Sequence, residues 1–265
     1  MKTLRLLTIL LAVSLATVSI FGGFVPGTYA RDAASMAAQG TGQDLVDLFL
    51  VVPLLLLSFL LFSKGSRVAT LIYGGTLLYI LYSFVIYCFG VHFNRLFLVY
   101  CATLGLSLYA FILFMTQIRK QRLEGWFAGA PVKWVAGYLF FVAVVFYILW
   151  LSSLVPAIIQ DTVPRDVAGY GLLVNPVHVI DMAFALPGLI LGSVLLWKGK
   201  ATGYLIASIA LVFMILLTIA LAGMVIMLFV RDISEDYTVA MVFAALTLTS
   251  IVFSVLFFRK IKPAV

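Results

Sequence analysis

Long apolar stretches, separated by short polar segments, run through the whole chain of 265 residues. Their apolar positions are continuous rather than strictly alternating, which favours helices over the strands of a barrel. A helix needs about 20 apolar residues to cross hydrocarbon, and the stretches of that size lie near 4–24, 45–63, 68–91, 96–118, 134–159, 178–197, 204–230 and 240–258. The pattern predicts an all-α integral membrane protein with eight transmembrane helices.

Two of these stretches, VDLFLVVPLLLLSFLLFSKG and IDMAFALPGLILGSVLLWKG, place the same uncommon residues at the same spacing. Each of four residues in the first stretch has an identical counterpart 134 positions later. The first four are Asp47, Pro53, Lys64 and Gly65, and their counterparts are Asp181, Pro187, Lys198 and Gly199. We therefore expect two four-helix transmembrane repeats, residues 1–118 and 134–265, joined by a basic cytoplasmic linker at 119–133. An even number of helices in each predicts parallel repeats, related by an axis along the membrane normal.

Composition agrees with a lipid environment, since 65% of residues are hydrophobic, 10% are charged and the mean hydropathy is +1.21. Soluble domains have about 45–50% apolar and about 25% charged residues. Most of the 17 Lys and Arg residues lie in alternate connections, at 2–5, 64–67, 119–133, 198–200 and 259–262. By the positive-inside rule, both termini are predicted to be cytoplasmic, in a plasma or inner membrane. The basic excess is then a topology signal, and no nucleic-acid partner is expected.

The first apolar stretch has two interpretations. Residues 1–30 have a basic start, an apolar middle and the ending Thr28-Tyr29-Ala30, which resembles a secretory signal cleaved after Ala30. Alternatively, residues 4–24 are a retained helix. The second interpretation is favoured because residues 134–159 hold the equivalent place in the second repeat and cannot be removed from the chain.

The aspartates can be explained without a functional role. Asn175 and Pro176 have the residue types of an N-cap and a first helical position. An acid in the first helical turn is favoured by the helix dipole. This explanation accounts fully for Asp44 and partly for Asp47 and Asp181, and it predicts that Asp44→Asn has little effect.

A functional explanation competes with it. Ala185, Gly188 and Gly192 continue the helix face of Asp181 as a track of small residues. Such tracks suit close helix packing, so Asp181 is expected to point into the bundle. An inward ionisable residue in a membrane helix is a functional candidate. The candidate ligands for a proton, cation or small solute are Asp47, Asp181, His178, Asn175 and Asp44, with the first three expected in one outward-facing cavity.

Pro53 and Pro187 lie near the middle of their predicted spans. Each proline removes one backbone hydrogen bond, and in an α-helix the carbonyls of Phe49 and Ala183 would lose their usual partners. The two prolines, with Gly188, are predicted kinks that serve packing. A hinge or a cation-accepting carbonyl is the alternative.

The remaining residues exclude several cofactor sites. Only two histidines are present, His92 and His178, so bis-histidine ligation of two haems is excluded. The motifs of di-iron sites, zinc proteases and phosphate-binding loops are absent. No cofactor is expected, and the metal question is left open.

Two further groups have alternatives. Cys88 and Cys101 flank one predicted outer turn at similar depth; free cysteines are expected, with a disulfide as the alternative. Four tyrosines fall in a row, and we expect packing plus an outer aromatic belt, with a ligand-stacking wall as the alternative: Tyr73, Tyr79, Tyr82 and Tyr87.

Three functional hypotheses follow. The first is a small transporter or receptor-like module with an outward-facing acidic site. The second is a non-catalytic subunit or scaffold that packs against other membrane proteins. The third, a membrane enzyme using Asp47, Asp181 and His178, is weakest, because the chain has too few polar groups for a nucleophile, a base and an oxyanion site together.

Overall fold

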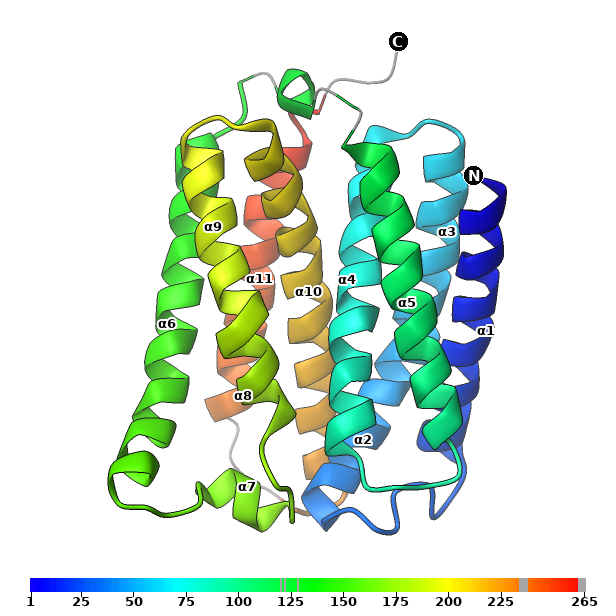
Figure 1. The fold of residues 1–265 in the computed structure, drawn as a ribbon, viewed down its shortest axis with the longest axis vertical. Coiled ribbons are helices and arrows are strands. Elements are labelled where there is room, and N and C mark those ends of the chain that lie inside the picture. Colours follow the sequence, from blue (N-terminus) through cyan, green and yellow to red (C-terminus); the bar gives the residue numbers. More distant parts are fainter. Residues whose placement is uncertain (120, 122, 128, 234–237, 262–265) are drawn as a thin grey trace.

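The computed structural model describes residues 1–119, 121, 123–127, 129–233 and 238–261, and over these residues it contains helices and no strands (Figure 1). It has eight helical spans long and apolar enough to cross a membrane. The spans are α1 (Lys2–Phe24), α2–η1–α3 (Ala34–Val46, Asp47–Val51, Val52–Ser63), α4 (Arg67–Gly90), α5 (Phe97–Ile118), α6 (Val132–Ile159), α8–η3–α9 (Pro176–Ile180, Asp181–Ala185, Leu186–Trp197), α10 (Ala201–Val230) and α11 (Thr238–Phe258). Two short helices, η2 (Leu123–Trp126) and α7 (Arg165–Gly169), lie in connections. For the described residues, the prediction of an all-helical chain with eight spans long and apolar enough to cross a membrane is therefore confirmed.

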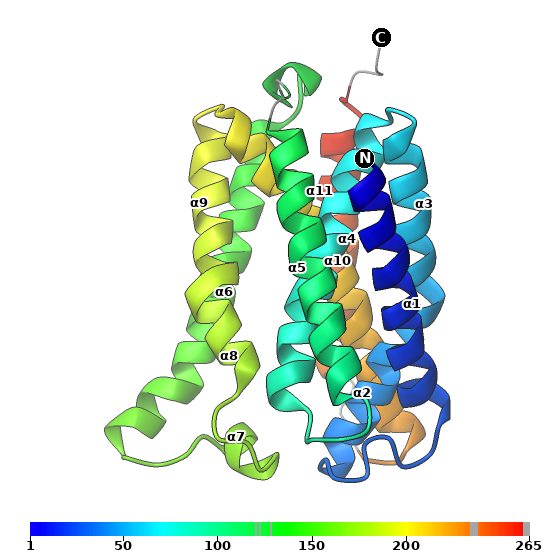
Figure 2. The ribbon, with the colours of Figure 1, turned by 45° about the vertical axis from the view of Figure 1, so that its right-hand side comes forward.

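Helices α4 and α10 are the most deeply buried spans and pack against each other. Helices α3 and α5 pack on α4, whereas α9 and α11 pack on α10; α1 packs on α2, α3 and α5. Figures 1 and 2 show that α1 begins and α11 ends at the same end of the bundle, with α7 at the opposite end. We call these the terminal end and the α7 end.

Helix α2 crosses α10 at very short range. A Cβ atom on Gly42 would lie 2.3 Å from the backbone carbonyl oxygen of Gly223. Only glycine allows this approach, because the neighbouring atoms belong to the backbone and cannot rotate away. The contact fixes the α7 end of α2 on the second half of the chain.

The broken spans each contain a π-helical turn that ends two positions before their proline. The turns are η1 at Asp47–Val51 and η3 at Asp181–Ala185, separated by the same shift of 134 residues as the sequence match. In each turn the aspartate carbonyl accepts the N–H of a residue five positions later, Val52 or Leu186. A widened turn of this kind accommodates a proline that would clash with an α-helical carbonyl.

The π turns correct one prediction. With the backbone ladder shifted by one residue, the carbonyl opposite the proline nitrogen belongs to Leu48 or Met182, not to Phe49 or Ala183. The expected kink positions near Pro53 and Pro187 are thus π turns, which bend helices. Gly188 lies one residue past Pro187, and a Cβ there would meet nothing within 4 Å.

Candidate functional site

Asp44 is buried in the interior of α2, with 0% of its surface exposed. Helix α2 begins at Ala34, so Asp44 lies ten residues inside it and the first-turn explanation is wrong. The segment before Asp44 contains two glycines and several small polar residues, which made it look like a connection. In the structure it is helical and packs closely on α10 at Gly42.

The Asp44 carboxylate accepts hydrogen bonds from two tyrosines. The Tyr29 hydroxyl donates at 2.5 Å and the Tyr87 hydroxyl at 2.9 Å. Gly22 of α1 makes room for them, because a Cβ there would lie 1.7 Å from a carboxylate oxygen of Asp44. Burial, followed by the nearby Asp44 charge, raises the pKa of Tyr29 well above its ordinary value. Its hydroxyl therefore keeps its proton and remains a donor.

The tyrosine partners of Asp44 are themselves packed against aromatic rings. The Tyr87 ring stacks on Phe84 at 5.0 Å and meets Tyr100 edge-on at 5.3 Å. Tyr100 in turn accepts a hydrogen bond from the Asn94 side chain at 3.0 Å. This packing fixes the direction of the hydroxyl groups, as an ordered polar network requires.

Asp47 and Asp181 also point inward, and each meets a tyrosine of α4. Tyr79 donates to Asp47 at 2.7 Å, and Tyr82 donates to Asp181 at 2.9 Å. The second oxygen of Asp181 accepts the indole N–H of Trp150 at 2.8 Å. Since the two tyrosines are three residues apart on one helix, α4 links the two acids.

For the tyrosine row, the predicted packing is confirmed, but the predicted aromatic belt is wrong. Tyr73, Tyr79, Tyr82 and Tyr87 are all buried rather than placed in an aromatic belt. Three of them bond to aspartates, and Tyr73 bonds to Thr8 at 2.7 Å. The available signal was the spacing of Tyr79 and Tyr82, because two polar side chains three positions apart share one face of a helix.

His178 belongs to a second polar group one turn from Asp181. Its ring packs on Trp150 at 4.7 Å between centroids, and its Nε2 lies 3.5 Å from an Asp166 oxygen. Asn175 caps α8 by accepting the N–H of Val177 at 2.9 Å and donates to Asp166 at 2.8 Å. The N-cap prediction for Asn175 is confirmed.

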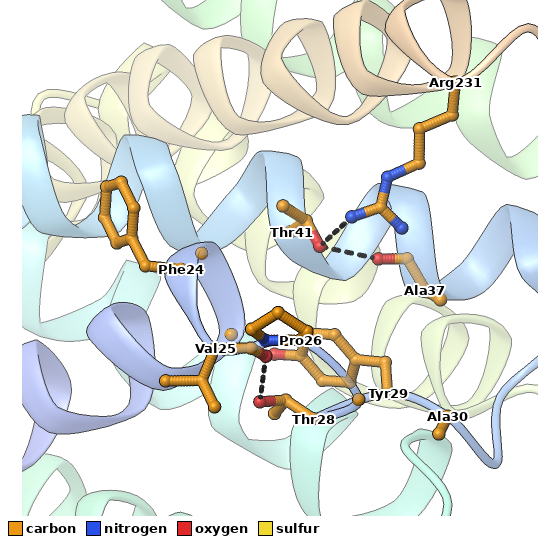
Figure 3. Close-up of a pocket in the computed structure, with 12 residues that line it drawn as sticks. Phe24, Val25, Pro26, Thr28, Tyr29, Ala30, Ala37, Thr41 and Arg231 are labelled. Carbon is orange, nitrogen blue, oxygen red and sulfur yellow. Dashed lines mark hydrogen bonds between the residues drawn. The ribbon is translucent and has the colours of Figure 1, made fainter.

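The expected single cavity with Asp47, Asp181 and His178 matches neither of two cavities formed by described residues. The larger one, about 340 Å³, is lined by Tyr29, Thr41 and Arg231 together with neighbouring loop residues (Figure 3), and by none of the three predicted residues. The smaller one, about 40 Å³, is lined by Asp181 and mostly apolar side chains. Asp47 and Asp181 do not share a cavity because their carboxylates turn toward different tyrosines, Tyr79 and Tyr82.

The donors around the three buried acids are neutral. The salt bridges between described residues join only His92 with Asp32 and His178 with Asp166. Over the same residues, no group of three His, Cys, Asp or Glu side chains is placed to hold a metal ion. Asp44, Asp47 and Asp181 thus accept hydrogen bonds from tyrosine hydroxyls and from the Trp150 indole.

Cys88 of α4 and Cys101 of α5 are free, and their thiols lie near enough to influence each other electrostatically. Mild oxidation with copper phenanthroline should therefore join them within one chain. Non-reducing peptide mass spectrometry would detect the linked peptides, with Cys101→Ser as the control. Recovery of both cysteines as unlinked peptides after full oxidant exposure would contradict the contact.

No protein-family model, curated protein or solved structure that was compared with the chain matches it. The assignment of function therefore depends on the geometry of these residues.

Proposed function

We propose that the protein is a small membrane transporter or receptor-like module in which Asp44, Asp47 and Asp181 form exchangeable proton or cation sites. The main support is that three buried carboxyl groups in membrane-spanning helices are held by neutral donors. An isolated charge is unfavourable at such a site, so a proton or a bound cation would neutralise it. Ionisable residues in this position are characteristic of proton and ion pathways.

The link through α4 gives the sites a way to influence one another. Tyr79 and Tyr82 bond to acids from the two halves of the chain. Gain or loss of a proton or cation at one acid changes the hydrogen bond that its tyrosine makes, and a shift of α4 would reach the other acid. Two acids bonded to one helix therefore suit a protein that responds to, or moves, a small solute.

We further propose that residues 1–118 and 134–265 are parallel repeats related by an axis along the membrane normal. The matching π turns support this relation, as do the left-handed glycines Gly65 and Gly199 after α3 and α9. The two termini would then be cytoplasmic and the α7 end extracytoplasmic.

Thiol labelling of intact cells tests this orientation. In a chain with both native cysteines replaced by alanine, Leu173→Cys should react with an impermeant maleimide, because Leu173 is 99% exposed in the connection between α7 and α8. Gly125 is exposed in η2, in the connection between α5 and α6, so Gly125→Cys should react only after the cells are opened. The reverse labelling pattern would show that the orientation is inverted.

Infrared difference spectroscopy tests the proton or cation site in the purified protein. On changing pH from about 4 to about 9, or on adding Na⁺ or K⁺, the carboxyl bands of the wild type should change. Asp181→Asn should remove part of this change while leaving the fold intact, because asparagine is nearly isosteric and can still bond to Trp150 and Tyr82. Asp44→Asn and Asp47→Asn test the other two acids.

Asp161→Asn is the matched control, since Asp161 is exposed in the loop between α6 and α7. It should retain the buried-carboxyl signal. If the wild type shows no buried-carboxyl change with pH or with either cation, the sites do not exchange ions. The network would then be purely structural, and a non-catalytic subunit or scaffold would become the leading hypothesis, to be tested by copurification of a fixed partner.

A further inference from the structure

The larger cavity lies at the α7 end, between the end of α1, the loop that follows it, α2 and the end of α10. Its volume of about 340 Å³ falls in the range of small-molecule pockets, about 300–1,000 Å³. Figure 3 shows Arg231 and Thr41 on one side of it and the loop with Thr28 and Tyr29 on the other. The cavity thus brings three separate segments of the chain together.

The Arg231 guanidinium is held in place at the cavity wall. Its Nη2 donates to the Thr41 hydroxyl at 2.9 Å, and that hydroxyl donates its own proton to the Ala37 carbonyl at 2.9 Å. Thr41 is therefore fixed as the acceptor. A guanidinium has five N–H donors, and the ion pairs between described residues do not include Arg231. Donor capacity remains for a ligand.

The other groups on the wall are compatible with an anion. Among the residues that the structure describes, none that lines the cavity carries a carboxylate. Asp44 lies behind Gly22, and its two oxygens already accept bonds from Tyr29 and Tyr87. In the loop, the N–H groups of Gly27 and Tyr29 do not donate to any backbone carbonyl of the described residues. The residues of the wall therefore supply a fixed cation and two N–H groups, of Gly27 and Tyr29, without a backbone partner among the described residues.

We propose that this cavity binds a small anion through a carboxylate or phosphate group, with Arg231 as its main ligand. A guanidinium binds either group with two parallel hydrogen bonds. The anion could be a free solute or the headgroup of an acidic lipid, because the chemistry that Arg231 recognises is the same. The site does not depend on proton or cation exchange at the buried acids.

Calorimetric titration of the full-length protein in neutral detergent tests the proposal, with inorganic phosphate and succinate as probes. Nanodiscs with and without phosphatidylglycerol test the lipid source by native mass spectrometry. Arg231→Gln should weaken binding of at least one probe by about tenfold or more, because a charge-assisted bond is lost. Arg95→Gln is the matched control, since Arg95 is exposed at the same end and outside the cavity.

Ala30→Trp provides a test that keeps the charge, because an indole at this lining position would occupy the cavity. It should also abolish binding, while the melting temperature without ligand shows that each variant is folded. Loss of phosphate or succinate binding in both cavity variants supports a solute site, and loss of phosphatidylglycerol alone supports a headgroup site. Equal binding of all probes to Arg231→Gln and Arg95→Gln, or no binding to the wild type, would overturn the proposal.

Discussion

Gly42→Ala should destabilise the folded bundle, although alanine is the better helix former. The new Cβ would lie 2.3 Å from the Gly223 carbonyl oxygen and 2.8 Å from the Met224 Cα, so α2 and α10 would have to separate. Overpacking typically costs about 1–3 kcal/mol, and it is most severe against backbone atoms. Alanine recovers at most about 1 kcal/mol through helix propensity. Unfolding in detergent by heat or by added SDS would measure the net loss.

Gly105→Ala is the matched control for this prediction. Gly105 lies inside α5, and a Cβ there would meet nothing within 4 Å. The same chemical change should therefore leave stability unchanged or raise it by up to about 1 kcal/mol. If the two variants unfold at the same SDS fraction, the close approach of α2 to α10 is not a constraint on the fold.

Asp44→Leu should cause the second large loss of stability. Leucine removes the acceptor of both Tyr29 and Tyr87, whose hydroxyls lie in the buried interior. An unsatisfied buried donor costs about 1–3 kcal/mol. Asp44→Asn keeps one carbonyl oxygen and should lose less, so the expected order of stability is wild type, then Asn, then Leu. The same unfolding measurements give this order.

A double-mutant cycle separates these hydrogen bonds from general packing. If Asp44→Leu acts through Tyr87, then Tyr87→Phe should cost less in the Leu background than in the wild type. Asp161→Asn, in the exposed loop, should have no effect in either background. A Leu variant as stable as the wild type would mean that desolvation of the carboxyl outweighs its two hydrogen bonds, as happens for some buried ionic groups.

The sequence pattern predicted the spans well where the signal was local. Apolar length placed the eight helical spans, and Asn175 with Pro176 marked the start of α8. The first half of α2 was not predicted, because its small and polar residues do not form an apolar run, and its contact at Gly42 is with Gly223, 181 residues away. No local propensity records such a contact.

The candidate site was predicted only in part. The inward direction of Asp47 and Asp181 is borne out, but their partners could not be assigned, since a tyrosine on α4 can face several neighbours. The sequence pattern gave no indication that Tyr29 or Arg231 belongs to a site. Each lies in or next to a connection, and only the folded arrangement brings it to Asp44 or to Thr41.

The π turns have a consequence for helical phase. A π turn holds one residue more than an α turn, which displaces the preceding residues by about 100° around the helix axis. The small-residue stripe through Gly188 and Gly192 therefore does not run straight on to Asp181. Gly192 faces Ile206 of α10, whereas Asp181 is turned toward Tyr82 of α4 and Trp150 of α6. The one extra residue in the π turn, rather than any change in amino-acid composition, therefore decides which side chains Asp181 contacts.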